Sequence, residues 1–350
     1  MIKVKHENRN LMDEKLLEPY SIFYSDDSIP GISRIRDKES FIYFNPDGTK
    51  ITDKKILKRI ASLAIPPAYE EVWISPYDNS HIQATGRDIR GRKQYCYHPL
   101  WKLVRDENKF KSMISFGKML PIIRQHVDKE LNHSLSMSKE QVICAIIYLL
   151  DNYYIRIGNA VYEKLNNSYG LTTLRKKHLM ISSTKAVLDF KGKNLHAWHV
   201  VLRDRKLIKI LKKCEEIPGY RLFKYLDENN SHIEITSQDV NTYLKNLTEC
   251  NFTAKDFRTW AACREALFRL SKINASDRSK SALKDTILEV SKLLGHTPTI
   301  CKKSYIHPEI IRHWEKNNLE KWIRKHSRYL NDKDELLLKW LEEHIIEDTI

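Results

Sequence analysis

The part of this 350-residue chain most suggestive of chemistry is the stretch LLGHTPTICKKSYIHPE, which follows an apolar helical stripe ending at Gly295. A histidine, two lysines and a tyrosine occur there within ten residues, at His296, Lys302, Lys303 and Tyr305. A tyrosine among cations is either a buried phenol with well-paired neighbours or a nucleophile beside the anion that it attacks. The stretch alone leaves both interpretations open.

Arg156 is a second residue whose position suggests an anion. It lies in the motif YYIRIGN, directly after an apolar helix, so we expect it near the interior, where an arginine needs an anion or a carboxylate. Structural pairing with Asp151 or Glu163 is the simpler alternative.

Lys193 and Arg258 can each be interpreted in two ways. Lys193 lies in FKGKN, which predicts a turn; lysines on turns are usually solvated, although a turn can also carry a flexible ammonium group into a groove. Arg258 lies in the first turn after a helix cap at Thr253 and off the apolar stripe, so it could be an ordinary surface arginine.

A basic and aromatic segment lies earlier in the chain, with the sequence HIQATGRDIRGRKQYCYHPLW. In its predicted strand QYCY, Tyr95 and Tyr97 share one face and Cys96 points the other way. Cations can meet phosphates while glutamine and tyrosine reach base edges or stack, so we expect this segment to contact DNA. A solvated basic turn beside an edge strand is the alternative. The candidate DNA-binding residues are Arg87, Arg90, Arg92, Lys93, Gln94, Tyr95 and Tyr97.

Three other patterns suggest sites but fail on chemistry, and we predict no metal site. The glycines of GRDIRGRK are spaced as in a P-loop, but Arg92 stands where the lysine belongs and no serine or threonine follows Lys93. His196 and His199 lie on a predicted strand, where residues three apart face opposite sides, so we expect no shared metal. The acidic run EEHIIED near the C-terminus is expected to be a solvated helix face.

Composition restricts the class of protein. Hydrophobic residues make up 41% and charged residues 30%, which argues against long disorder, and a formal net charge of +15 would attract a polyanion such as nucleic acid. The six cysteines include no CxxC pair, so we expect reduced thiols and neither disulfides nor a zinc site. The N-terminal residues MIKVKHENRNLMDEK contain no apolar run, and VICAIIYLL is too short to span a bilayer. We therefore expect a soluble, intracellular protein without a secretory signal.

Hydrophobic periodicity predicts two domains. Residues 1–104 show short strand patterns such as FIYFN and VWI between turn signals, with one helix at DKKILKRIASLA, which predicts a small β-rich α+β domain. Residues 105–350 are mostly helical. Within them we expect strands at TTLRKKHLMI, AVLDF and LHAWHVV, the last two joined by a tight turn at 191–194.

Together the motifs follow a recognisable order: an arginine after an apolar helix, a hairpin lysine, a Lys-x-x-Arg helix start, and a histidine nine residues before a tyrosine. The chain resembles a small type IB DNA topoisomerase, of the branch found in large DNA viruses and in bacteria. The resemblance extends over residues 65–310 and is carried by HIQATGRDIRGRKQY with YHPLW, YIRIGN, FKGK, KDFRTW and LGHTPTICKKSYIHP. CKKSYIHP is closer to the bacterial and giant-virus forms than to the poxvirus form.

The resemblance implies a role for each member of the catalytic set. Tyr305 matches the family's nucleophile, which attacks a backbone phosphorus, expels the 5'-hydroxyl and leaves a 3'-phosphotyrosyl link. Arg156, Arg258 and His296 match the groups that donate to the nonbridging oxygens. Lys193 matches the general acid of the family's hairpin.

The same resemblance implies a partner and an architecture. Gln94, Tyr95 and Tyr97 match positions that contact DNA in the family. The expected partner is double-stranded DNA, held in a C-shaped clamp by the β-rich domain and the helical catalytic domain. We expect a monomer that needs no ATP, metal or other cofactor. The expected location is the bacterial cytoplasm, or the virion or host-cell compartment of a large DNA virus.

Two alternatives share part of this pattern. A tyrosine recombinase uses the same catalytic groups, but recombinases usually carry His-x-x-Arg where this chain has Lys255 to Arg258, and they usually have a helical N-terminal domain. A non-catalytic DNA-packaging protein would need only a basic surface, and binding alone requires no tyrosine nine residues after a histidine. The motifs favour the topoisomerase over both.

Overall fold

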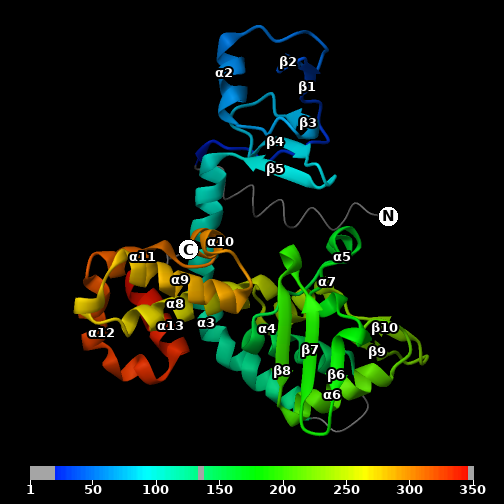
Figure 1. The fold of residues 1–350 in the computed structure, drawn as a ribbon, viewed down its shortest axis with the longest axis vertical. Helices are drawn as coiled ribbons and strands as arrows, with labels where there is room; N and C mark the ends of the chain where they lie inside the picture. The colour runs from blue at the N-terminus through cyan, green and yellow to red at the C-terminus, as the bar shows by residue number, and fades with distance from the viewer. Residues whose placement is uncertain (1–19, 133–137, 346–350) are drawn as a thin grey trace. The chain divides into compact units, whose positions relative to one another are not determined.

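The computed structural model describes residues 20–132 and 138–345. Two expectations concern residues outside these ranges: the absence of a secretory signal and the end of the acidic run EEHIIED. The chain forms two compact units, Met1–Lys109 and Phe110–Ile350 (Figure 1). Helix α3 (Pro99–Asn132) contains both this division and the boundary expected at residue 104. The assignment of the two domains to DNA binding and catalysis stays a prediction.

The N-terminal unit is built on a five-stranded antiparallel sheet with the strand order β2-β1-β3-β4-β5 (Figure 1). Ile32 and Ile74 of the sheet pack against Ile60 of helix α2 (Lys54–Ser62), so the predicted combination of a sheet with one helix is confirmed. The strands are β1 (Ile32–Asp37), β2 (Ser40–Phe44), β3 (Glu70–Ile74), β4 (Ile82–Arg87) and β5 (Lys93–Tyr97).

The C-terminal unit is mostly helical, as predicted, and two small sheets interrupt its helices. One sheet has the order β6-β7-β8, with strands Leu179–Ile181, Ala186–Lys191 and Ala197–Leu202, and the other pairs β9 (Lys224–Leu226) with β10 (His232–Glu234). After α3 the helices are α4 (Lys139–Tyr153), α5 (Ala160–Asn166), α6 (Arg205–Glu216), α7 (Ser237–Thr248), α8 (Ala254–Ser271), α9 (Lys280–Leu294), α10 (Pro298–Ser304), α11 (Pro308–Glu315), α12 (Asn318–Lys325) and α13 (Lys333–His344).

Two local predictions are wrong in the small sheet. Only the last three residues of TTLRKKHLMI pair with β7, and most of the rest forms the short helices η2 (Leu171–Thr173) and η3 (Lys176–His178). The reason is a different partner for the backbone, since the Leu222 amide donates to the Leu174 carbonyl at 2.9 Å. The turn after β7 is also wider than expected, because it closes with a bond from the amide of residue 192 to the carbonyl of residue 196.

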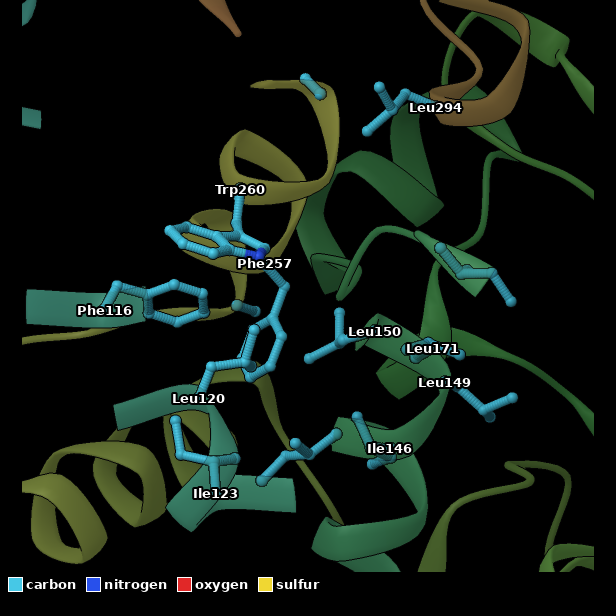
Figure 2. Close-up of a cluster of buried hydrophobic side chains, with 14 of the residues drawn as sticks. Phe116, Leu120, Ile123, Ile146, Leu149, Leu150, Leu171, Phe257, Trp260 and Leu294 are labelled. Carbon is cyan, nitrogen blue, oxygen red and sulfur yellow. The ribbon is translucent and has the colours of Figure 1, made fainter. Parts of the chain in front are cut away.

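Helix α4 lies at the centre of the C-terminal core, and most of its residues are buried. Its apolar side chains belong to one cluster with those of α3 and α8 (Figure 2). Because α4 ends at Tyr153 and α8 starts at Ala254, this core fixes the helix ends near Arg156 and Arg258. The labelled members of the cluster include Phe116, Leu120, Ile123, Ile146, Leu149, Leu150, Phe257 and Trp260.

Candidate active site

Four of the five predicted catalytic residues line a single pocket of about 250 Å³ in the C-terminal unit: Arg156, Lys193, Arg258 and Tyr305. The fifth, His296, contacts both arginines. The fold therefore brings together side chains from four motifs that are far apart in the sequence.

The backbone of Arg156 is held by a crossing with the segment before β6. The Leu171 amide donates to the Arg156 carbonyl at 2.8 Å, and the Thr172 amide donates to the Ile157 carbonyl at 2.7 Å. Gly170 lies so close to this crossing that a Cβ atom there would be 2.5 Å from the Arg156 oxygen. A larger residue at position 170 would separate the two segments and move Arg156 in the pocket.

Arg258 is buried, with 3% of its surface exposed, so its interpretation as a surface arginine is wrong. Its guanidinium donates to the main-chain carbonyls of Tyr154 and of Leu294, the latter at 2.6 Å. It also lies 2.8 Å from Nε2 of His296. Arg258 is buried although it lies off the apolar stripe of α8, because its side of the helix faces the C-terminal ends of α4 and α9. The carbonyl groups at those ends have no partners within their helices and can accept from the guanidinium group.

His296 is placed by the end of helix α9. Gly295 adopts the left-handed conformation, with a φ of +58°, and the His296 amide donates to the Ser291 carbonyl at 2.9 Å, as in a Schellman cap. A Cβ atom at position 295 would also lie 2.8 Å from Cδ2 of His196. The predicted helix end at Gly295 is confirmed, and the same glycine leads the chain to the contacts between His296 and the two arginines.

The two arginines surround a histidine ring that is neutral near pH 7. Nη2 of Arg156 lies 3.0 Å from Nδ1 of His296 and donates to the Gly295 carbonyl at 2.9 Å. Burial, and then the charges of Arg258 and Arg156, lower the pKa of His296 to about 3. A neutral imidazole accepts at one nitrogen only, so just one of its two arginine contacts is a hydrogen bond. Burial and the charge of Arg156 also lower the pKa of Arg258 to about 10.

The expected pairing of Arg156 with Asp151 or Glu163 does not occur. Asp151 accepts from Arg124 at 2.7 and 3.1 Å, and Glu163 pairs with two other arginines. Within the described part of the chain, Nη1 of Arg156 and Nε of Arg258 are buried and have no hydrogen-bond partner. Buried charged donors without acceptors are costly, and an anion is the kind of group that could accept from both.

Tyr305 follows α10 and lies against this cationic group. Its ring centroid is 4.2 Å from that of His296 and 5.8 Å from the guanidinium carbon of Arg258. The side chain is half-buried and lines the pocket, which favours the interpretation as a nucleophile over that of a fully buried phenol. Lys193 reaches the same pocket from the exposed turn between β7 and β8, whereas Lys302 is exposed on α10.

The candidate DNA-binding residues lie on β4, on β5 and on the turn between them, and three of the cations are not free. Glu71 and Asp27 come from other segments of the N-terminal unit, so sequence spacing gave no sign of these pairs. Arg90 is exposed at the turn. The ion pairs are Arg87 with Glu71 at 2.5 Å, Arg92 with Asp88 at 2.7 Å and Lys93 with Asp27 at 2.5 Å.

The predicted faces of strand β5 are confirmed. Tyr95 and Tyr97 stack on one side with ring centroids 5.8 Å apart, and Cys96 packs against the core of the sheet. Gln94 alternates with Tyr95 and donates to Asp88 at 3.0 Å. The aromatic face and the glutamine are therefore separate features of the strand.

The remaining patterns can also be located in the structure. Among the described residues there is no group of three or more metal-ligating side chains, and His199 instead lies 3.1 Å from Asp189. In the described part of the acidic run, Glu342 and Glu343 are exposed as expected, and Glu343 also accepts from the Trp322 indole at 2.6 Å. No disulfide joins any of the six cysteines, all of which lie in the described ranges. No helix in those ranges is long and apolar enough to cross a membrane.

Two residues that contribute to the site were not predicted. Tyr154 ends α4 in the left-handed conformation, with a φ of +58°, and its carbonyl accepts from Arg258. That conformation is usual for glycine or asparagine, so a tyrosine gave no signal for it. Gly170 could have been recognised as a turn glycine, but its close approach to Arg156 depends on the crossing of two segments.

Comparison with known proteins agrees with this geometry. Residues 98–330 match the family model of the eukaryotic DNA topoisomerase I catalytic core, and residues 40–88 match that of the bacterial DNA topoisomerase IB N-terminal domain. The chain is 31% identical to DNA topoisomerase 1B of Acanthamoeba polyphaga mimivirus over 324 residues, which cover 90% of this chain and 95% of the relative.

More distant relatives extend the same similarity. DNA topoisomerase 1B of vaccinia virus (strain Copenhagen) is 25% identical over 292 residues, which cover 77% of this chain and 88% of the relative. DNA topoisomerase 1 of Candida albicans is 25% identical over 320 residues, which cover 82% of this chain but 39% of that longer protein.

The pocket brings a tyrosine, a lysine and two arginines together, which is a set of side chains that phosphoryl transfer can use. Because the catalytic-core model matches most of the chain and a relative is 31% identical over 90% of it, this protein belongs to the type IB DNA topoisomerases. The viral enzymes are relatives that it matches along most of their length. Nothing in the fold or in these similarities favours a recombinase or a packaging protein.

The low pKa of His296 predicts a pH dependence of stability. A folded-state pKa of about 3, below the ordinary 6.5, means that between these pH values the unfolded chain binds a proton that the folded protein does not. The stability that this difference gives is present above pH 6.5 and is lost as the pH falls toward 3. We expect the free energy of unfolding, measured by urea denaturation between these pH values, to fall less steeply with falling pH for His296→Asn than for wild type. The difference in slope should correspond to up to about one proton bound on unfolding. Equal slopes would mean that His296 titrates normally.

Proposed function

We propose that the protein relaxes supercoiled double-stranded DNA by cutting and resealing one strand, with Tyr305 as the nucleophile. The observation that carries the proposal is the pair of arginines that line the pocket with Tyr305, the half-buried Arg156 and the buried Arg258. Each has one buried nitrogen, Nη1 of Arg156 and Nε of Arg258, that has no hydrogen-bond partner among the described residues. A phosphodiester supplies an anion with two nonbridging oxygens, which suits the fork of a guanidinium group.

In the proposed reaction, the phenolic oxygen of Tyr305 attacks phosphorus, and the bond from phosphorus to the 5'-oxygen breaks. The phenol gives its proton to solvent water as the new bond forms, and the strand is left attached through a 3'-phosphotyrosyl link. Lys193 donates a proton to the departing 5'-oxygen, which leaves as a hydroxyl group. Religation reverses each step, so the covalent link conserves the energy of the phosphodiester and no ATP is consumed.

Side chains of the protein supply the charge stabilisation in this mechanism. Negative charge grows on the nonbridging oxygens as Tyr305 attacks, and Arg156, Arg258 and an N–H of His296 donate to them. Each guanidinium has five N–H groups, so the arginines can bind phosphate and keep part of their contacts with carbonyl groups. Three donors and one general acid fill the roles that metal ions have in other phosphoryl-transfer sites, and we propose a reaction without metal or other cofactor.

We further propose that both units hold the duplex, as a monomeric C-shaped clamp. Tyr95 and Tyr97 present a stacked aromatic face, and the ion-paired cations exchange a carboxylate for a phosphate when DNA binds. The enzyme would act in the bacterial cytoplasm, or in the virion or host-cell compartment of a large DNA virus. The proposed DNA contacts of the N-terminal unit are Arg87, Arg90, Arg92, Lys93, Gln94, Tyr95 and Tyr97.

Incubation of supercoiled plasmid with the purified protein, in EDTA and without ATP, tests the proposed function. We expect a ladder of relaxed topoisomers from wild type and none from Tyr305→Phe, because this change removes only the nucleophilic oxygen. Denaturing gels should show a covalent protein–DNA adduct for wild type alone, while both proteins bind DNA nearly equally. An adduct with Tyr305→Phe would reassign the nucleophile, and recombined or knotted products would favour a recombinase.

The role of Lys193 can be tested by changing the leaving group. Lys193→Ala should slow single-turnover cleavage by about a hundredfold to ten-thousandfold, with little change in DNA affinity, because an alkoxide is a poor leaving group. Replacing the bridging 5'-oxygen with sulfur gives a thiolate, which departs without a proton. The same variant should therefore cleave the sulfur substrate at close to the wild-type rate.

Arg156→Ala and Arg258→Ala are the controls for this comparison. Their proposed task is to stabilise the nonbridging oxygens, so both variants should remain slow on the sulfur substrate. Equal defects of Lys193→Ala on the two substrates would exclude the general-acid role and leave Lys193 as a solvated turn residue.

A further inference from the structure

Helix α13 carries a carboxylate that three donors on other helices surround. Asp334 accepts from the Trp260 indole at 2.6 Å, from Arg264 at 3.0 Å and from Arg124 at 2.8 Å. Burial would raise the pKa of Asp334, but the charges of Arg264 and Arg124 outweigh it and hold the pKa below its ordinary value. The group is therefore ionised near pH 7, and it lies beyond residue 330, where the match to the catalytic-core family ends.

One route from Asp334 leads to the catalytic pocket through Tyr154. Arg264 uses one terminal nitrogen for Asp334 and the other for the phenolic oxygen of Tyr154, at 2.6 Å. The main-chain carbonyl of the same tyrosine accepts from Arg258. A carboxylate, an arginine and a tyrosine thus link α13 to a guanidinium group that lines the pocket.

A second route from Asp334 leads to the end of α4. Arg124 joins the two carboxylates of Asp334 and Asp151, and it contacts Asp151 at 2.7 and 3.1 Å. Asp151 lies in the last turn of α4, and Tyr154 and Arg156 follow three and five residues later in the chain. Both routes therefore support the same short segment.

The backbone of this segment requires support because Tyr154 is left-handed, with a φ of +58° and a ψ of +20°. This conformation is unfavourable for a residue with a Cβ atom, and it persists where the surroundings hold it. If Tyr154 adopted a right-handed conformation, its carbonyl would no longer accept from Arg258, and the backbone at Arg156 would be displaced. The position of both catalytic arginines thus depends on the contacts of one tyrosine.

We propose that Asp334 is a positioning residue for DNA cleavage, acting through Arg264 and Arg124 to hold Tyr154 in the conformation that places Arg156 and Arg258 around the phosphate. The inference rests on the proposed function of the pocket. It gives helix α13 a part in catalysis, although the residues that line the pocket come from other elements.

Asp334→Asn tests this proposal because it keeps the shape of the side chain and removes its charge. It also places an N–H group next to the donors that the carboxylate normally accepts from. We expect single-turnover cleavage at saturating protein to slow by about tenfold to a hundredfold, with unchanged DNA affinity, as for displacement of a catalytic group by about 1 Å. The 5'-sulfur substrate should show the same loss, because leaving-group protonation is not the affected step. Tyr154→Phe, which removes only the oxygen that Arg264 contacts, should also slow both substrates.

Glu343→Gln is the matched control on the same helix. Glu343 also accepts from an indole, that of Trp322 at 2.6 Å. It pairs with Lys339 at 3.1 Å and lies 3.2 Å from Nε2 of His326. This variant should lose stability in thermal unfolding but cleave both substrates at the wild-type rate. All rates are measured well below the unfolding temperature of each variant, so that loss of folded protein does not enter the comparison.

A double-mutant cycle shows whether Asp334 affects cleavage through the position of Arg258 or independently of it. If Asp334 acts partly through Arg258, then Asp334→Asn should slow cleavage clearly less in an Arg258→Ala background than in wild type. Equal losses in both backgrounds, or an unchanged rate for Asp334→Asn alone, would overturn the proposal. If Asp334→Asn does not fold, Tyr154→Phe carries the same cycle. Failure of the wild type to form an adduct would overturn the proposed function instead.

Discussion

The constraint on which the rest of this structure depends is a pair of arginines, the half-buried Arg156 and the buried Arg258, that contact opposite sides of His296. Among the described residues, no carboxylate forms an ion pair with either of them. Like charges repel strongly away from water, and burial together with Arg156 lowers the pKa of Arg258 to about 10. The fold offsets this cost with main-chain carbonyls at the ends of α4 and α9 and at Gly295, and with the neutral ring of His296. Donors of both arginines remain without partners in the described part of the chain. We propose that a DNA phosphate supplies the missing negative charge.

The side chains proposed to stabilise charge are held by the core, whereas the proposed proton donor is exposed. Arg156, Arg258 and His296 lie at or near helix ends that are anchored in the core. The backbone conformations and close contacts at Gly170, Gly295 and Tyr154 hold these three residues near one another. Lys193, which would deliver a proton to a leaving group, lies on an exposed turn instead. This division fits a reaction in which charge stabilisation needs preorganised donors, whereas proton transfer needs a side chain that can reach the departing oxygen.

The candidate site could be predicted as a set because its four motifs resemble those of one family, whereas local patterns alone set the spacing of only part of it. His296 and Tyr305 lie in one motif, where a helix cap and a single short helix set their separation. Contacts between distant segments could not be predicted in this way. Asp151 is close to Arg156 in the sequence, yet it pairs with Arg124, because helix α3 packs beside α4 and supplies a nearer guanidinium. Three other features could not be predicted from local sequence either: the ion pair of Lys93 with Asp27, which lies 66 positions away, the pairing of the three-residue strands β9 and β10, and the left-handed conformation of Tyr154. These features depend on tertiary packing that periodicity and motif spacing do not encode.

The central claim is that a DNA phosphate completes the charge of this site, and the imidazole of His296 reports on it directly. Its pKa is about 3 in the DNA-free protein because of burial and of the two arginines, and an anion between them would offset their charge. The measurement is an NMR titration of histidine-labelled Tyr305→Phe protein, alone and bound to a duplex that the wild type cleaves. The account predicts that the pKa of His296 rises by about two pH units or more when the duplex is bound. An unchanged pKa in the bound state would contradict it.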